Sequence, residues 1–259
     1  MTSTLDAVYT LWLREMKRFI KSRSRMVGSG GQPLIWLAIV GVGLGSAFAL
    51  KVSGSIPYLA FVAPGLIGMT ILFSSIFAGV SVIWDRQFGF LKEILVAPIS
   101  RLSIVLGKIA GSTTIAVLTA LIILVIVAVF GIIPLSYFTL QGIAAAILFM
   151  VLTSATFVAI GLIIAALINN IESFQVLINF LVMPMFFLSG ALFPISAALP
   201  VWLDGLAHID PLFYAIDGIR GSLIHFSTYP LWIDGIGTAA CAVIFVGAAA
   251  LLFKRIEGK

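Results

Sequence analysis

Charged residues are scarce in this sequence of 259 residues. Asp, Glu, Lys and Arg make up only 10% of the chain, whereas hydrophobic residues make up 61%, and the mean hydropathy is +1.21. A soluble protein of this length needs far more polar surface, because water must solvate the outside of its fold. The shortage of charge therefore excludes a soluble fold and indicates an integral membrane protein.

Cysteine and histidine are nearly absent as well. Cys241 is the only cysteine, so the fold has no intramolecular disulfide. His208 and His225 do not have the spacing of metal ligands, and the sequence has no His-Glu-x-x-His motif and no cysteine cluster. We therefore predict neither a metal site nor catalytic residues, which argues against an intramembrane enzyme.

Stretches without any charged residue define the predicted membrane spans. They cover residues 26–50, 52–84, 109–171, 173–203 and 235–253. A helical span needs about 20 apolar residues, so the third stretch is long enough for two spans, with a turn between them at Gly131 to Ser136. Residues 115–130 do not alternate between apolar and polar, as a strand of a β-barrel does. The sequence predicts an all-α polytopic membrane protein whose six transmembrane helices form a bundle over residues 34–253, in one domain.

The fifteen basic residues are divided unequally between the two sides of these spans. Thirteen fall on one side, and only Lys51 and Arg220 fall on the other. Because Lys and Arg accumulate on the cytoplasmic side of membranes, we expect a multi-pass protein of the plasma membrane with both termini in the cytoplasm. The same asymmetry accounts for the net charge of +5 without any binding of nucleic acid.

Residues 1–27 precede the first predicted span and have the pattern of an amphipathic helix. Apolar residues recur at helical spacing at Leu5, Val8, Tyr9, Trp12, Leu13, Met16, Phe19 and Ile20. This pattern predicts an interfacial helix along the cytoplasmic surface of the membrane. Such a helix is either a lipid anchor alone or also a contact for a cytoplasmic partner. The candidate contact residues are Trp12, Arg14, Glu15 and Arg18.

Residues 85–101 connect the second and third predicted spans and have an ordered pattern of their own. Phe88, Leu91 and Ile94 can share one face of a helix, and Pro98 ends that helix. The pattern predicts a short cytoplasmic helix parallel to the membrane.

The motifs in this connection resemble those of ABC-2 type transporter permeases, particularly the drug and antibiotic-resistance branch. Asp85, Arg86 and Gly89 match the family's Asp-Arg-Glu-x-Gly, with Gln87 in place of the acidic residue. Pro98-Ile99-Ser100-Arg101 and Gly107-Lys108 match the end of the family's segment. The resemblance implies that residues 85–101 form a coupling helix against an ATP-binding subunit. Its contact residues would be Asp85, Arg86, Phe88, Gly89, Lys92, Glu93, Pro98 and Arg101.

Residues 194–230 match the family's external segment through Asp210-Pro211-Leu212-x-Tyr214-Ala215-Ile216-Asp217-x-x-Arg220, with Asp210 in place of Asn. Residues 196–208 and 211–224 are too short to span a membrane, and Asp210 followed by Pro211 is typical of a helix start. By resemblance, two half-helices re-enter the outer leaflet here, although an ordinary external loop remains an alternative. The predicted external gate consists of Trp202, Pro211, Tyr214, Asp217 and Arg220, with an ion pair between the last two.

The resemblance further implies that the chain is the permease of an ATP-driven exporter. Two copies would assemble with two ATP-binding subunits, which hold ATP and Mg. This chain itself lacks the glycine-rich phosphate loop, because no glycine lies five residues before the Gly107-Lys108 pair. We therefore expect it to bind no cofactor and to be no enzyme.

The predicted spans contain no charged residue, which favours a hydrophobic or amphiphilic cargo such as a drug or a lipid. The candidate residues along its path are Phe73, Phe77, Phe180 and Phe187. A lipid-linked polysaccharide exporter of the same family remains an alternative. An ATP-independent channel or secondary transporter is a further alternative, although it would normally carry ionisable residues within its spans.

Overall fold

The computed structural model describes residues 4–22, 51–52, 56–88, 100–168, 170–195 and 200–255, together with isolated positions between residues 31 and 43. The first predicted span, at residues 34–50, lies outside the continuously described ranges. Most of the predicted coupling helix lies outside the described residues too, including Gly89, Lys92, Glu93 and Pro98.

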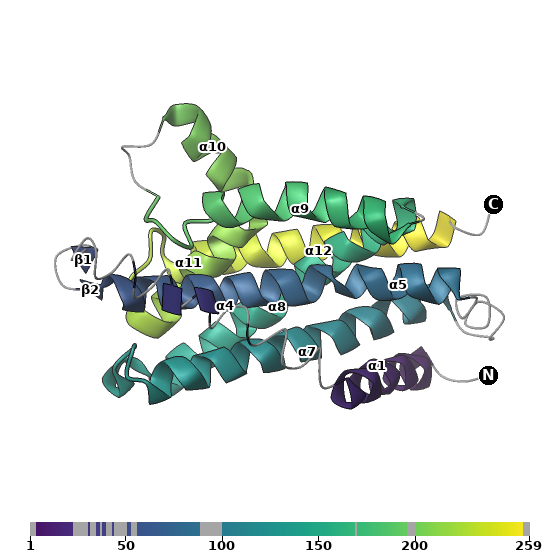
Figure 1. Ribbon diagram of the computed structural model, residues 1–259, viewed down its shortest axis with the longest axis horizontal. Coiled ribbons are helices and arrows are strands. Elements are labelled where there is room, and N and C mark those ends of the chain that lie inside the picture. Colours follow the sequence, from purple (N-terminus) through teal and green to yellow (C-terminus); the bar gives the residue numbers. More distant parts are fainter. Residues whose placement is uncertain are drawn as a thin grey trace.

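The described residues are almost entirely helical, as Figure 1 shows. The helices are α1 (Thr4–Lys21), α4 (Tyr58–Ile76), α5 (Ala78–Gln87), α7 (Arg101–Val129), α8 (Leu140–Leu167), α9 (Ile171–Leu188), α10 (Val201–Ile209), α11 (Pro211–Ile224) and α12 (Leu231–Arg255), and a 3-10 turn, η2, covers Leu135–Tyr137. Two short strands, β1 (Lys51–Val52) and β2 (Ile56–Pro57), pair antiparallel.

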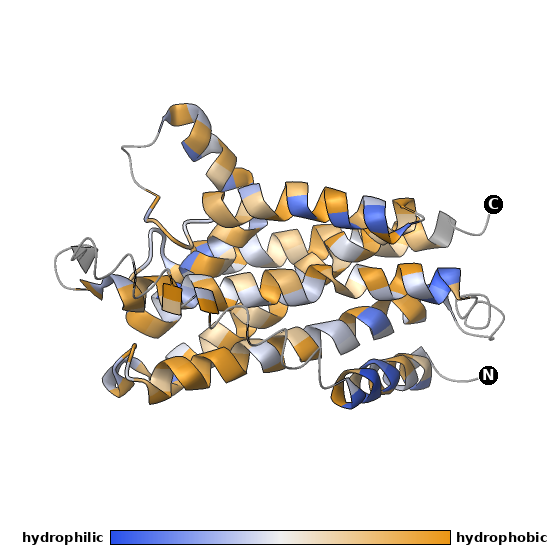
Figure 2. Ribbon diagram, viewed as in Figure 1, coloured by the Kyte–Doolittle hydropathy of each residue, from blue (hydrophilic) through white to orange (hydrophobic). Residues whose placement is uncertain are grey.

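Five helical segments within the described residues are long and apolar enough to cross a membrane. They are Tyr58–Gln87, which combines α4 and α5, then Arg101–Val129, Leu140–Leu167, Ile171–Leu188 and Leu231–Phe253. These segments run along the long axis of one bundle, and most of their residues are hydrophobic (Figure 2). The prediction of an all-α polytopic membrane protein is confirmed, with five of the six predicted spans in the described part of the chain.

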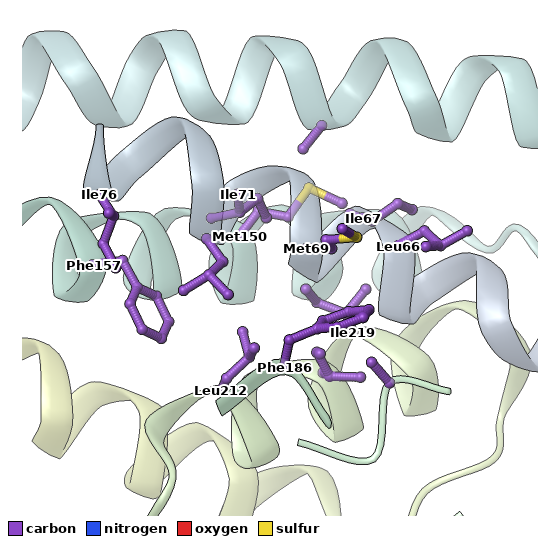
Figure 3. Close-up of a cluster of buried hydrophobic side chains, with 14 of the residues drawn as sticks. Leu66, Ile67, Met69, Ile71, Ile76, Met150, Phe157, Phe186, Leu212 and Ile219 are labelled. Atoms are coloured by element: carbon purple, nitrogen blue, oxygen red, sulfur yellow. The ribbon is translucent and has the colours of Figure 1, made fainter. Parts of the chain in front are cut away.

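The core of the bundle lies where α4 packs against α8. Leu66, Met69 and Ile71 of α4 are fully or almost fully buried, as are Met150 and Phe157 of α8, and Figure 3 shows them within one apolar cluster. Helix α8 also packs against α5, α7, α11 and α12. It is therefore the element around which the other helices are arranged.

The two ends of the bundle differ in what they carry. One end has α1, the end of α5, the start of α7 and the end of α12 (Figure 1); we call it the α1 end. The opposite end, which we call the α11 end, has the β1–β2 pair, α10 and α11. The predicted half-helix at 211–224 coincides with α11. The other predicted half-helix, at 196–208, corresponds to α10, although residues 196–199 lie outside the described ranges.

The helices of the bundle are longer than the uncharged stretches of sequence from which the spans were predicted. Asp85 and Arg86 belong to the last turn of α5, so they form the end of the second span rather than part of a separate helix. Lys108 lies two turns inside α7, and Asp234 lies in the first turn of α12. The uncharged stretches therefore form the middle of longer helices whose ends carry charged residues, and an ionic group near a span end is tolerated when other groups pair with it.

Candidate functional site at the α1 end

Lys108 is the centre of a buried ionic network. Its Nζ atom donates hydrogen bonds to Ser81 Oγ and Asp85 Oδ2, both at 2.9 Å, and it pairs with Glu15 Oε1 at 3.0 Å. The side chains of Lys108, Asp85 and Glu15 are only 5%, 4% and 7% exposed. An ammonium group has three N–H donors, so each donor has its own acceptor. The network joins one residue of α1, two of α5 and one of α7.

Asp85 extends the network to the two arginines of α1. Its second oxygen, Oδ1, accepts a hydrogen bond from Arg14 Nη2 at 2.8 Å and lies 3.7 Å from Arg18 Nη1. The Arg18 guanidinium also lies over the Trp84 ring, 5.7 Å from its centroid. Asp85 is thus surrounded by positive charge, which compensates for the loss of water around its carboxylate.

Two glycines of α7 allow α1 to approach this closely. A Cβ atom at Gly107 would lie 2.7 Å from Leu11 Cβ, and one at Gly111 would lie 2.8 Å from Glu15 Cβ. Glycines four residues apart form a shallow groove in which a second helix packs at short distance. At the edge of this contact, Trp12 Nε1 donates a hydrogen bond to Thr114 Oγ1 at 3.1 Å.

The face of α1 that meets the bundle differs from the apolar face read from the sequence. Ala7, Leu11 and Glu15 are buried against the bundle, whereas Leu5 and Tyr9 are exposed. The sequence pattern identified the apolar stripe correctly, but only one edge of that stripe, at Leu5, Tyr9 and Ile20, is exposed, and the other edge, with Trp12, is half-buried beside α7. The exposed edge can contact lipid, as an interfacial helix requires.

Arg86 connects the same end of the bundle to α8. Its Nη2 atom donates a hydrogen bond to the Ala165 carbonyl at 2.9 Å, and its Nη1 atom donates one to the Ile168 carbonyl at 3.2 Å. The last carbonyls of a helix have no partner within the helix and carry partial negative charge, so an arginine stabilises them well. Two other predicted coupling residues border the segment outside the described residues: Phe88 is exposed where α5 ends, and Arg101 is the first residue of α7.

At the α11 end, the buried side chain of Arg220 joins several elements, as Lys108 does at the α1 end. Its Nη2 atom donates to the Gly190 carbonyl at 2.7 Å, and its Nε atom donates to the Phe61 carbonyl at 3.3 Å. The guanidinium lies over the Phe61 ring at 3.9 Å. The predicted ion pair with Asp217 is present at 3.9 Å. Arg220 therefore holds α11, the start of α4 and the segment after α9 together.

Asp210 caps the start of α11, and Asp217, in the middle of that helix, binds the segment that follows it. Asp217 Oδ2 accepts hydrogen bonds from the backbone N–H groups of Thr228 and Tyr229 at 2.7 and 3.0 Å, which fixes the connection to α12. Asp210 Oδ1 accepts the Leu212 N–H at 2.9 Å and caps α11, with Pro211 at the helix start, as predicted. Of the other predicted gate residues, Trp202 is exposed, and the Tyr214 hydroxyl donates to the His208 carbonyl.

The four candidate path residues lie on two helices. The rings of Phe73 and Phe77 stack on α4 and its end with centroids 6.4 Å apart. Phe180 and Phe187 are exposed on α9. Their roles remain predictions. Among the described residues, no group of three or more His, Cys, Asp or Glu side chains gathers in a way that would hold a metal ion.

Sequence reasoning placed the residues of the α1 end in two separate sets, one on the first helix and one in the connection after α5. The structure brings Arg14 and Arg18 of the first set onto Asp85 of the second, and Glu15 of the first set shares Lys108 with Asp85. The central residue, Lys108, entered the sequence analysis only as part of a family motif. Its role was missed because a lysine beside an apolar stretch gives no signal of whether it faces water or a buried carboxylate.

Comparison with known proteins agrees with this architecture. Residues 6–224 match the family model for the ABC-2 type transporter. The chain is 33% identical over 190 residues to the transport permease ycf38 of Porphyra purpurea, across 73% of this chain and 64% of that protein. It is 23% identical over 249 residues to the inner membrane transport permease YadH of Escherichia coli K12, and 29% identical over 256 residues to nodulation protein J of Rhizobium meliloti. Each of these two matches covers 95% of this chain and 92% of the relative. The chain therefore belongs to the ABC-2 type transporter family, as its motifs predicted, and is a transport permease rather than an enzyme.

Proposed function

We propose that this chain is the membrane-spanning subunit of an ATP-driven ABC exporter. In this proposal it moves a hydrophobic or amphiphilic compound, such as a drug or a lipid, out of the cytoplasm or the inner leaflet. Membership of the ABC-2 family supports a role in transport. The sequence has no phosphate loop, so ATP and Mg are bound by a separate subunit, present in two copies beside two copies of this chain.

The ionic network at the α1 end is the observation that carries this proposal. The ATP-binding subunit contacts α1 and residues 85–101, and a push on either displaces Asp85. Because a buried carboxylate is strongly destabilised without its cations, Lys108 and α7 move with it. Arg86 transmits the same displacement to the end of α8. The α1 end is then the cytoplasmic end, with both termini there, in agreement with the distribution of basic residues.

The α11 end acts as the external gate in this proposal. Arg220 connects α11 to Gly190 and Phe61, so a tilt of the bundle helices pulls on all three contacts at once. The buried guanidinium loses its carbonyl partners if α11 moves alone. The half-helices therefore open as a unit when the helices beneath them move.

The proposal is tested by expressing the chain with a candidate ATP-binding subunit from the same organism and reconstituting the complex in liposomes. Vanadate-sensitive ATP hydrolysis is measured for the wild type, Arg14→Ala and Lys17→Ala. Arg14→Ala removes a hydrogen bond to Asp85, whereas Lys17 is exposed on the same helix and serves as the matched control. We expect the complex to form in all three, with hydrolysis reduced severalfold only in Arg14→Ala.

Two other results would count against the proposal. Equal hydrolysis in Arg14→Ala and Lys17→Ala would show that the network does not couple the two subunits. Failure to form any complex, together with ATP-independent flux through the chain alone, would favour a channel or a secondary transporter.

A further inference from the structure

Asp234 is a buried carboxyl group without a partner. It lies in the first turn of α12 and is completely buried, and neither of its two oxygens accepts a hydrogen bond from any described residue. An acidic residue at a helix start often accepts a backbone N–H of its own helix, but Asp234 accepts none. Because nearly all buried polar groups in folded proteins have a hydrogen-bond partner, this carboxyl group has to be stabilised in another way.

Helix α11 packs beside Asp234. The two helices α11 and α12 lie against each other at the α11 end (Figure 1). One turn from Asp234, the ring of Tyr214 occupies the place of a side chain at Gly237, where a Cβ atom would lie 3.0 Å from Tyr214 Cγ. Asp217 of α11 is near enough for its charge to act on Asp234. The exposure of Asp234 to water therefore depends on the position of α11.

The one cation of α11 is already paired. Arg220 is the only Lys or Arg residue in this helix, and its Nη1 atom lies 3.9 Å from Asp217 Oδ1. Asp217 also accepts hydrogen bonds from the backbone N–H groups of Thr228 and Tyr229. The cation and both donors thus stabilise the carboxylate of Asp217, and among the described residues they leave Asp234 without a contact.

The other helices around Asp234 carry no charge that could compensate it. Helices α7 and α8 also pack against α12, but α8 has no titratable residue, and Arg101 and Lys108 of α7 lie near the α1 end. The remaining titratable groups beside this contact are neutral at pH 7; they are Tyr214, Tyr229 and Cys241. An ionised Asp234 would therefore be a second negative charge beside Asp217, without a cation of its own.

Binding of a proton removes this imbalance. A buried carboxylate with neither a cation nor a hydrogen-bond donor is so unfavourable that the group takes up a proton and becomes neutral. A metal ion is a poor alternative, because the described residues contain no group of three or more His, Cys, Asp or Glu side chains that could hold one. A proton needs neither further ligands nor a cavity.

Asp210 shows the same behaviour at the start of α11. It is buried, its Oδ2 atom has no partner among the described residues, and burial raises its pKa to about 7 although the hydrogen bond from Leu212 opposes this rise. The contact between α11 and α12 thus keeps water away from two carboxyl groups. Any experiment on Asp234 has to be separated from the titration of Asp210.

We propose that Asp234 is a proton-binding site controlled by α11. The carboxyl group holds a proton while α11 lies against α12, and it releases that proton to water when the two helices separate. The binding site is independent of the proposed function, whereas its consequence for transport rests on that function. Opening of the external gate releases the proton, so an acidic exterior favours the closed gate.

The first test detects the proton by infrared spectroscopy in lipid nanodiscs. Protonated carboxyl groups have a separate C=O stretching band, and labelling with carbon-13 aspartate identifies the bands of aspartate. Asp210→Asn is the parent protein, to which Asp234→Asn or the control Asp204→Asn is added. At about pH 6 an ordinary aspartate is ionised, so we expect a protonated band in the parent and the control, and its loss with Asp234→Asn. A band that is missing from the parent, or unchanged by Asp234→Asn, would overturn the proposal.

The parent protein alone gives two further decisive results. A protonated band that disappears as the pH rises through about 4 belongs to an ordinary aspartate and contradicts a site that keeps its proton at neutral pH. A band that disappears when sodium chloride replaces choline chloride identifies a bound cation in place of the proton. A band that persists in both conditions supports the proposal.

The second test follows the contact between α11 and α12 by amide hydrogen exchange. The exchange rate of α11 in the wild type is divided by the rate in Asp234→Asn at the same pH, which cancels the intrinsic pH dependence of exchange. Asparagine has the size of the protonated residue and cannot ionise. We expect a ratio near 1 at about pH 6 and about fivefold at about pH 9, where the wild type loses its proton. A constant ratio would show that the proton does not hold the two helices together.

The link to the gate is tested separately in the complex with the ATP-binding subunit. In liposomes, only the pH on the side opposite that subunit is changed, from about 6 to about 9. We expect vanadate-sensitive hydrolysis to rise severalfold in the wild type and to stay constant in Asp234→Asn. Equal pH dependence in both refutes the link to the gate but leaves the binding site intact. Failure to form a complex counts against the proposed function, and the infrared result stands without it.

Discussion

At the scale of single residues, the buried ion pairs of this protein contribute to stability in a different way from the exposed ion pairs of soluble proteins. Lys108, Asp85 and Glu15 are almost fully buried, and each has a partner on another helix. An exposed ion pair contributes little to stability, whereas removal of one member of a buried group leaves the others without compensation. The large effects of substitution should therefore concentrate on a few charged residues.

Lys108→Met provides the clearest case. The substitution keeps an unbranched side chain of nearly the same length but leaves two buried carboxylates, Glu15 and Asp85, without their shared cation. We expect the free energy of unfolding to fall by about 3–5 kcal/mol, measured by thermal denaturation in lipid nanodiscs. Lys17→Met on the exposed surface of α1 is the control and should change stability by less than about 0.5 kcal/mol. Equal losses in both variants would contradict the role of the network.

Asp210 leads to a prediction about pH. This residue lies between α10 and α11, outside the spanning helices, and burial raises its pKa from 3.8 to about 7, partly opposed by the hydrogen bond from Leu212. The folded state therefore prefers the protonated carboxyl, so the contribution of Asp210 to stability is lost as the pH rises from about 4 through about 7.

Asp210→Asn should remove this dependence, because asparagine caps a helix equally well and has no charge to bury. We expect the variant to be more stable than the wild type at pH 8, with the difference disappearing below pH 4. Thermal unfolding of both proteins across this range measures the difference, with Asp204→Asn, a half-exposed carboxylate of α10, as control. A constant difference across the range would show that Asp210 does not titrate in this way.

At the scale of the element, α1 is held by its fit to α7 as much as by charge. Gly107 and Gly111 leave no room for a side chain between the two helices. The exposed apolar face of α1 adds contact with lipid but does not fix the position of the helix along α7. Its position follows from the glycine groove and the ion pairs together.

Replacement of Gly111 by alanine should displace α1. A Cβ atom there would lie 2.8 Å from Glu15 Cβ, so the helix must shift and the pair with Lys108 must lengthen. We expect faster amide hydrogen exchange throughout α1, measured by mass spectrometry. Gly247→Ala on α12, where nothing lies within 4 Å of the added atom, should leave exchange unchanged. Similar exchange in both variants would mean that the groove does not hold α1.

At the scale of the whole molecule, the two ends of the bundle are each held together by one buried cation. Lys108 connects α1, α5 and α7, and Arg220 connects α4, α11 and the segment after α9. Helix α8 packs against the helices of both ends. A displacement at the α1 end therefore has a continuous packed route to the α11 end. This arrangement suits the proposed exporter, in which ATP hydrolysis at one end opens the other.

The sequence alone determined the class of the protein, most of its spans and its family. Long uncharged stretches leave helices as the membrane-spanning structure because each backbone polar group must be paired within the bilayer. Local chemistry also predicted the start of α11, where Asp210 and Pro211 form a cap whose geometry depends only on neighbouring residues.

Only the tertiary structure decided which charges meet. Glu15 and Lys108 are 93 residues apart in the sequence, and neither residue type signals whether it is buried. The apolar stripe of α1 was visible in the sequence, yet the residues buried against α7, Leu11 and Glu15, are not part of that stripe, and only its edge at Trp12 borders the contact. Hydrophobic periodicity records which residues avoid water, and both lipid and protein satisfy that requirement. The choice between them depends on shape and charge, and so on the glycine groove and the carboxylates that surround Lys108.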